Sequence, residues 1–473
     1  MPSLSSPGIG SGLDVKSIVS QLVALERRPI DKALRDQKDT EAQLSSFGLL
    51  QSYTNNLRDA ARKLSLPGTW TPLTATSSDS ASVSASISGS PATGSYSLQA
   101  TQLARAQNLA SPAFASPAST FGAGTLTLQL GSWSSGPPVS FSAKSASTPV
   151  SVSVTAGDSL STVRDRINNA GAGVRASIVN DGTGSRLVIR SEVTGAENAV
   201  KIVAAGDPSL EDLAYSPDEL TPGNMTQTLS ARDATATING LPVSSPTNTL
   251  SGAVQGLTLT LSQVTTNAVE VTITQDSAAM RKSVDDFVKA YNDLNAYVLD
   301  QTRYDPEKKV AGKLQGDSAT RSLQTQLRQA LQAPSGATAG FSTLSSLGIQ
   351  LQRNGSLLVN NSLFSTALGD PAALAAAFSA EAPGEANDGF GVRFTSLTNA
   401  LTDADGLLQS RAEGLRSRIK RQQDKVSDLE SRVARTEERL LRQYNTLDNN
   451  LGRLNGLGGY VSQQVTAWNN TKR

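Results

Sequence analysis

Both ends of this 473-residue chain carry apolar residues that recur in alternating steps of three and four. In the C-terminal part the pattern runs from Leu408 to Leu440, about five heptads, and resumes at Tyr444 after one extra step of four. A shorter seam runs from Leu50 to Leu64. A helix with such a stripe must bury it against another helix. The pattern therefore predicts a coiled coil or bundle formed by the two ends, or by two copies of the C-terminal helix.

Proline and glycine set the expected limits of these helices. A helical pattern with Ile18, Leu22 and Leu25 on one face precedes Pro29. This proline is expected to interrupt the helix or to begin a new one, because it lacks a backbone donor. The three glycines between residues 456 and 459 are expected to loosen the chain near its C-terminus.

Between the two helical ends the apolar period changes to two. Val150, Val152 and Val154, for example, alternate with polar residues, which is typical of a strand with one face on a core and the other in water. Residues 71–275 contain only 22 charged residues out of 205, and the helical period returns at Asp276. We therefore predict an α+β multidomain fold. A helical coiled-coil or bundle leg is built from both termini, and β-rich head domains are nested between them.

The chain contains no cysteine and no histidine. This excludes disulfides, thiol nucleophiles, histidine-based triads and zinc sites of the Cys/His type. A net charge of +1 gives no general attraction to nucleic acid or to a membrane surface. No run reaches the roughly 18 apolar residues of a transmembrane helix, and the N-terminus lacks the features of a cleavable secretory signal. We expect no catalytic site, metal, cofactor or membrane insertion, and either a cytoplasmic location or export without such a signal.

Three local motifs suggest chemistry at first sight. The glycines of Gly8–Gly12 do not fit the dinucleotide-binding spacing, and no strand precedes them. Asp285 and Asp286 lie beside the apolar seam of a predicted helix, where a solvated face is the expected interpretation. The basic C-terminal helix lacks clustered aromatics and keeps acids such as Glu430 and Glu437 among its bases. Nucleic-acid binding is therefore not expected.

Several short motifs follow one another in an order that is specific as a combination, although each is weak alone. They are Gly8–Val15, Gly94–Leu98, Gln102–Gln107, Ile238–Gly240, Asn248–Thr249, Gly256–Leu259 and Phe287–Asn292. Residues 150–200 resemble the flagellin-hook insertion motif, which several axial proteins share. Over nearly its whole length the chain resembles the bacterial flagellar hook-associated protein 2, or filament cap, family.

This resemblance implies a non-enzymatic assembly protein. Family members form a ring, of about five subunits, at the distal tip of the flagellum. The terminal helices make legs that reach the filament, and flagellin arriving through the channel is folded and inserted beneath the plate formed by the β domains. The implied partners are other copies of the chain, flagellin, the hook-associated junction proteins, the type III export apparatus and an export chaperone that holds the C-terminal helix. The implied location is secreted and extracellular.

Periodicity and resemblance together predict four nested parts. These are a terminal coiled-coil leg, disordered until assembly, at 1–40 and 435–473; a helical bundle with a small hairpin at 41–74 and 276–434; a β-rich head domain at 75–109 and 231–275; and an inserted β-rich head domain with the insertion motif at 110–230. Unsatisfied seams at both ends support the expectation that the leg orders on binding.

The resemblance assigns the two seams to different partners. Contacts with other subunits or with the filament are expected from Ile18, Leu22, Leu25, Leu50, Leu57, Leu64, Leu415, Ile419, Val426, Leu429, Val433 and Leu440. Chaperone binding is expected from Leu447, Leu451, Leu454, Val461 and Val465.

Two other functions compete with the cap. A hook–filament junction protein or a dedicated surface adhesin could be built from similar parts, and adhesion to host surfaces could coexist with capping. The motifs around Asn239 and Tyr291 disfavour the junction protein. An enzyme is disfavoured by the composition.

Overall fold

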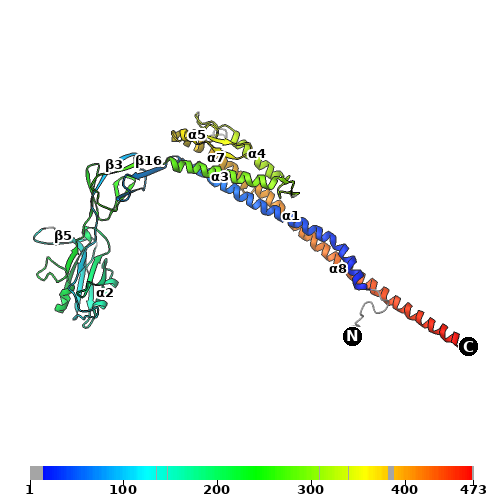
Figure 1. Cartoon of the computed structure of the whole chain (residues 1–473), viewed down its shortest axis with the longest axis horizontal. Helices are drawn as coiled ribbons and strands as arrows, with labels where there is room; N and C mark the ends of the chain where they lie inside the picture. The colour runs from blue at the N-terminus through cyan, green and yellow to red at the C-terminus, as the bar shows by residue number, and fades with distance from the viewer. Residues whose placement is uncertain are drawn as a thin grey trace. The chain divides into compact units, whose positions relative to one another are not determined.

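The computed structural model describes residues 14–134, 136–145, 147–307, 309–338, 340–381 and 388–470, with side chains as far as Trp468. The chain divides into two compact units (Figure 1). The helical unit contains residues 1–71 and 277–473, and the β unit contains residues 72–276. The predicted α+β class, with helices from both termini and β-rich domains between them, is confirmed. The finer division into four nested parts stays a prediction.

Two long antiparallel helices dominate the helical unit. Helix α1 spans Val15–Leu64 and helix α8 spans Leu407–Asn470. Asp14 caps α1 by accepting a hydrogen bond from the backbone N–H of Ser17, at 3.0 Å. Gln51 of α1 donates to Gln409 near the start of α8, at 3.2 Å, while the N-terminal end of α1 packs near Tyr444. The two ends of the chain therefore pair with each other, as Figure 1 shows for the blue and orange helices.

Two expectations about helix limits were wrong. Pro29 lies inside α1 without ending it, because it removes one backbone donor while the neighbouring turns keep theirs and the helix packs along α8. Gly456, Gly458 and Gly459 lie inside α8. Each glycine lowers helix stability by only about 1 kcal/mol, which weakens a long helix without requiring a break.

Shorter elements complete the bundle around the C-terminal part of α1. They are η1 (Pro67–Trp70), α3 (Ser277–Thr302), β17 (Tyr304–Asp305), β18 (Val310–Ala311), α4 (Ser318–Gln332), β19 (Ile349–Leu351), β20 (Leu357–Val359), α5 (Asn361–Ala367), α6 (Pro371–Ser379) and α7 (Phe390–Thr402). Strands β19 and β20 form the predicted small hairpin.

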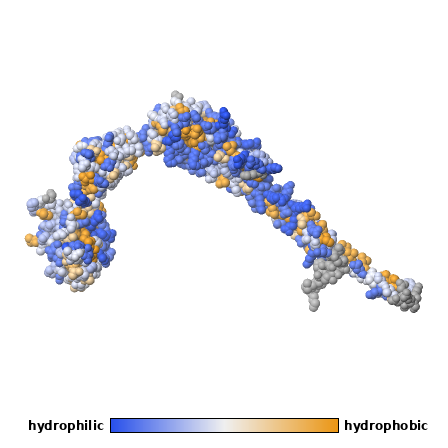
Figure 2. Space-filling model, viewed as in Figure 1, coloured by the Kyte–Doolittle hydropathy of each residue, from blue (hydrophilic) through white to orange (hydrophobic). Residues whose placement is uncertain are grey.

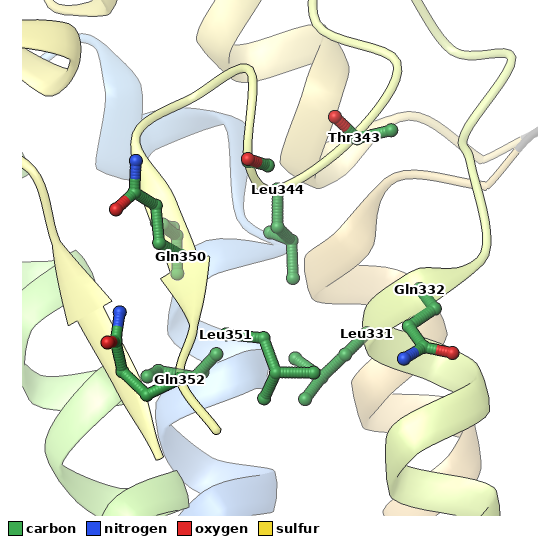
Figure 3. Close-up of a pocket in the computed structure, with 10 residues that line it drawn as sticks. Leu331, Gln332, Thr343, Leu344, Gln350, Leu351 and Gln352 are labelled. Carbon is green, nitrogen blue, oxygen red and sulfur yellow. The ribbon is translucent and has the colours of Figure 1, made fainter. Parts of the chain in front are cut away.

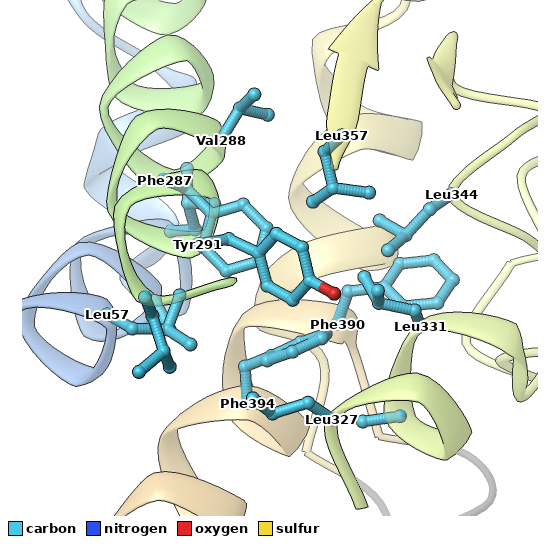
Figure 4. Packing of buried hydrophobic residues seen from close by; sticks show 14 of the residues in the cluster. Leu57, Phe287, Val288, Tyr291, Leu327, Leu331, Leu344, Leu357, Phe390 and Phe394 are labelled. Carbon is cyan, nitrogen blue, oxygen red and sulfur yellow. The ribbon is translucent and has the colours of Figure 1, made fainter. Parts of the chain in front are cut away.

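Aromatic residues fill the core of this bundle (Figure 4). Phe287 of α3 meets Phe394 of α7 edge to face, with ring centroids 5.2 Å apart. Trp70 stacks on Phe378 at 4.7 Å, and its indole N–H donates to the Leu64 carbonyl at the end of α1, at 2.9 Å. One continuous core thus fixes the base from which α1 and α8 extend.

The β unit contains two hydrophobic cores. The first lies between a five-stranded and a three-stranded antiparallel sheet. The five-stranded sheet has the order β1 (Leu73–Ser77), β16 (Val269–Gln275), β3 (Gly94–Gln102), β12 (Ala234–Ile238) and β13 (Leu241–Ser245). The three-stranded sheet has the order β14 (Thr249–Val254), β15 (Leu257–Leu261) and β2 (Val83–Ile87).

The second core lies within the inserted segment. One sheet contains β10 (Ala199–Gly206), β5 (Gly124–Trp133), β6 (Phe141–Ala143) and β7 (Val150–Val154). The other has the order β11 (Thr226–Leu229), β4 (Asn108–Ala110), β9 (Ser185–Ser191) and β8 (Val174–Asn180). Helix α2 (Leu160–Asn169), the short helices η2 (Ala196–Asn198) and η3 (Pro208–Leu213) complete it.

The inserted segment is tied to the first core where the chain enters and leaves it. Arg105 and Arg232 form an antiparallel bridge, with the Arg105 N–H donating to the Arg232 carbonyl at 2.9 Å. Gly195, at φ 110°, lies so close to Pro246 that a Cβ there would come within 2.8 Å of it. This approach needs glycine both for its backbone conformation and for its lack of a side chain.

Candidate interaction surface of the leg helices

We call α1 and α8 the leg helices. A thin apolar seam joins them, and their remaining surface is the candidate interaction surface. The residues of α1 that the seam buries are Val15, Val19, Val23 and Ile30. In this apolar cluster α8 contributes the buried residue Val433, while Ile419, Val426, Leu429 and Leu440 of α8 are half-buried. The seam therefore pairs the two ends of the chain but leaves part of its apolar surface open to a further partner.

Four residues predicted to contact other subunits or the filament lie instead in the bundle core. Leu50, Leu57 and Leu64 of α1 and Leu415 of α8 are at most 1% exposed. Helices of the same chain already cover these side chains, so in this fold they hold the base of the leg helices and do not present a surface.

The predicted N-terminal face is shifted by one residue from the face that α8 covers. Ile18 and Leu22 are half-buried, and Leu25 is 53% exposed. Val15, Val19 and Val23 are spaced four residues apart, so they share one helix face, and this face packs against α8. Ile18 and Leu22 are also four residues apart and share the neighbouring face. Two adjacent apolar faces thus exist on α1, and Ile18, Leu22 and Leu25 form the outer one.

The last turns of α8 present the largest run of exposed apolar side chains on the leg helices. We call Leu454, Leu457, Tyr460, Val461 and Val465 the apolar end of α8; their exposed fractions lie between 50% and 62%. Figure 2 shows orange surface towards the C-terminal end of this helix. Fully burying one such side chain contributes about 1.5–3 kcal/mol, so a partner that covers this surface gains a large driving force.

Most residues predicted to bind a chaperone belong to this surface. Leu447 is also exposed, at 45%, whereas Leu451 is half-buried. The sequence pattern missed Leu457 and Tyr460, which lie outside the alternating steps of the seam. Their mutual spacing of three is the signal that could have found them, because residues three apart are neighbours on a helix.

One ion pair with a buried carboxylate anchors α8 to the bundle. The Asp317 carboxylate, whose side chain is 6% exposed, accepts from the Arg411 guanidinium at 2.8 Å. Its other oxygen accepts from the Thr320 N–H and so caps α4. Both oxygens of the Asp317 carboxylate therefore have a hydrogen-bond partner, and the residue has a structural role.

Two groups with a shifted pKa outside the leg helices, Asp181 and Tyr291, serve the fold. Hydrogen bonds from the Thr183 hydroxyl and the Arg186 guanidinium lower the pKa of Asp181 far below its ordinary value, and all three residues hold the turn between β8 and β9. Burial raises the pKa of Tyr291 in the bundle core.

A cavity of 480 Å³ lies between the β19–β20 hairpin and the end of α4 (Figure 3). Its lining consists of leucines such as Leu331 and Leu344, neutral amides such as Gln350 and Gln352, and small hydroxyls. No carboxylate or amine lines it, so it offers no charged group for acid–base chemistry.

The described residues contain neither a cluster placed to hold a metal ion nor a membrane-spanning helix. No group of three or more acidic residues there is placed to hold a metal ion. No helix in the same part of the chain combines the length and hydropathy of a membrane span. Of the predicted N-terminal motif Gly8–Val15, residues 8–13 lie outside the described residues.

Comparison with known families gives three matches along the chain. Residues 11–107 match the N-terminal profile of flagellar hook-associated protein 2, and residues 231–456 match its C-terminal profile. Residues 138–193 match the flagellin hook IN motif. The two main profiles fall on both sides of the inserted segment, in the order that the motifs predicted.

Individual relatives extend this match over the whole chain. The A-type flagellar hook-associated protein 2 of Pseudomonas aeruginosa is 31% identical, with 97% of each chain covered. The flagellar hook-associated protein 2 of Escherichia coli K12 is 29% identical over the full length of both. The crystal structure of the D1–D2–D3 domains of the Escherichia coli flagellar cap protein matches with a TM-score of 0.59 and 29% identity, covering 78% of this chain and 99% of that one. The chain belongs to the flagellar hook-associated protein 2 family, the structural filament cap proteins of the bacterial flagellum, and is not an enzyme.

Proposed function

We propose that this chain forms a ring of about five copies at the distal tip of the flagellar filament. The ring retains flagellin that arrives through the filament and promotes its folding and polymerisation, so that the filament elongates. The observation that carries this proposal is the open apolar surface of the leg helices, on the outer face of α1 and the apolar end of α8, in a chain of the cap family. Such surfaces need helical partners, and the neighbouring subunits and flagellin would supply them.

The proposal includes the route by which the chain reaches the tip. It is exported through the flagellar type III apparatus, meets the hook-associated junction proteins at the base of the filament, and works outside the cell. Adhesion to host surfaces is the second role that we propose for the exposed tip.

Deleting the gene should leave cells that release unpolymerised flagellin and swim poorly, because nothing holds the subunits at the tip. Restoring the full chain should return flagellin to the cell surface. The measurement is the ratio of flagellin in the medium to flagellin in sheared filaments. Normal filaments in the deletion strain, with poor attachment to host cells, would contradict capping and support a dedicated adhesin.

We also propose that the apolar end of α8 binds the export chaperone. Deleting residues 440–473 is expected to abolish chaperone binding while the β unit stays folded, because neither core of the β unit contains a residue of α8. Calorimetric titration with the purified chaperone measures the affinity.

A triple substitution tests the chaperone contact without changing the residues of the α1–α8 seam. L454D/V461D/V465D changes only exposed side chains and should lose chaperone binding by roughly 100-fold, since each charge must be desolvated in an apolar contact. S462A/Q463A is the matched control on the same turns and should bind as the wild type does. Unchanged affinity in the truncated protein would rule the site out.

A further inference from the structure

One side of α8 carries a continuous line of positive charge that the seam does not use. With Ala412 and Leu415 as the first a and d positions, every g position over five heptads is basic. These residues are Arg411, Arg418, Lys425, Arg432 and Arg439. The adjacent c positions add Arg421, Arg435 and Arg442, with one acid, Asp428. We call the g residues from Arg418 to Arg439 the basic stripe.

The remaining faces of the same helix have the opposite character. Their bases are Arg416 and Lys420, and their acids are Glu413, Asp424, Glu430, Glu437 and Glu438. Bases and acids therefore gather on different faces of the helix. On a helix that only needs to be soluble, they would be mixed on every face.

The structure leaves the basic stripe exposed and unneutralised. All four of its side chains are exposed. At the two ends of the charged face, Arg411 pairs with Asp317 at 2.8 Å and Arg442 with Glu438 at 3.1 Å. Within the described part of the chain, no carboxylate lies within 4.0 Å of the stripe's own charged nitrogens. Four arginines of this face, Arg432, Arg435, Arg439 and Arg442, border a shallow hollow together with Thr436 and one acid, Glu438, which pairs with Arg442.

We propose that the basic stripe docks a helix of another protein that presents Asp or Glu at intervals of seven residues. Seven residues of α-helix rise about 10 Å, so carboxylates with that spacing on a helix running alongside meet successive cations of the stripe. From Arg418 to Arg439 the stripe is about 31 Å long, enough for three heptads of the partner. The e and g positions that flank a seam are the positions that choose the partner helix in coiled coils.

The acids of a second copy fit this role less well. At the e positions of α8 only Glu430 and Glu437 are acidic, against four cations in the stripe, and Arg416 is basic. Helix α3 does carry acids seven residues apart, at Asp286, Asp293 and Asp300. Each is already paired on its own helix, with Lys282 at 2.9 Å, Lys289 at 2.6 Å and Arg303 at 3.1 Å. A neighbouring cation accompanies every acid, so this face of α3 offers little net negative charge to the stripe.

The inference rests on the proposed function, because the leg helices would meet this partner in the assembled cap. The test uses the deletion strain complemented with full-length chains. R432E/R439E reverses two charges of the stripe, and R416E/K420E makes the same change in net charge on the other face of the helix. All four side chains are exposed, so both variants should fold, which circular dichroism of the purified proteins checks.

We expect R432E/R439E to release on the order of tenfold more flagellin into the medium than wild type, because like charges now face each other, and R416E/K420E to behave as wild type. Motile suppressors of R432E/R439E should change an acid to a base in a helix of a second protein. Equal loss in both variants would show a response to overall charge, such as binding of a nucleic acid, and would overturn the proposal. Suppressors confined to this chain would assign the stripe to a second copy or to folding, and would also overturn it. If the wild-type chain itself fails to retain flagellin, the capping function is wrong.

Discussion

Replacing Phe287 by alanine is expected to lower the free energy of unfolding of the helical unit by about 3–5 kcal/mol. Phe287 is 1% exposed and lies at the centre of the bundle core, edge to face with Phe394 (Figure 4). The substitution removes the ring from a fully packed site, and a close-packed core relaxes only partly into the space. The loss should be confined to the helical unit, because the β unit has cores of its own.

Tryptophan fluorescence can follow this unit alone. The chain has three tryptophans, and only Trp70 lies in the bundle core. In a background in which Trp133 and Trp468 are replaced by phenylalanine, the urea transition of Trp70 reports the helical unit. L358A is the matched control, because Leu358 is 55% exposed, and it should shift the transition by no more than about 0.5 kcal/mol. A shift below about 1 kcal/mol for F287A would mean that the bundle core does not hold this unit.

Local patterns predicted the parts of the fold that depend on near neighbours. The residues of α3 that the 3.6-residue period places on one face, from Met280 to Val298, are the buried ones. Asn239 and Gly240, at φ 50° and 81°, form the tight turn between β12 and β13 that this residue pair predicts. Such features are set within a few residues, so a single sequence contains the information.

Contacts between distant segments could not be predicted in the same way. Strand β3 pairs with β12 and β16, which follow it by more than 100 residues, and alternation shows that a strand exists without naming its neighbour. The need for glycine at position 391 also comes from a contact between distant segments. A Cβ there would come within 2.7 Å of the Ser65 backbone nitrogen, because α7 closely approaches the end of α1. Only the packed structure shows why that position needs glycine.

The sequence predicted only that the helix faces of the candidate surface need partners, and not which partners cover them. A seam in the sequence shows that a helix face must be covered, but not which copy or which protein covers it. Leu57 and Leu415 are covered within the chain, whereas Leu25 and Val461 remain exposed. The period is the same in both cases, so exposure in the folded chain had to decide between them.

Aspartates on the inner and outer faces of α1 are expected to have different effects. V19D/V23D places two charges in the seam with α8, where both valines are at most 7% exposed. The apolar cluster of the seam, as the described residues form it, has five buried members and cannot absorb two unpaired charges. The local free energy of opening should therefore fall by about 3 kcal/mol or more. Amide hydrogen exchange in the first turns of α1 and in the facing part of α8 should then accelerate by roughly 100-fold.

L22D/L25D is the matched variant, since it adds the same charge to the same helix turns on the outer face, where Leu25 is 53% exposed. Hydrogen exchange should stay close to that of the wild type, because α8 does not cover these side chains completely. Electron microscopy of the purified protein, however, should show fewer assembled rings, since a neighbouring subunit would have to bury the two charges. Equal exchange in the two variants would mean that α1 does not use separate faces for its own chain and for its partners. A loss of rings with exchange unchanged would place the outer face of α1 at the contact between subunits.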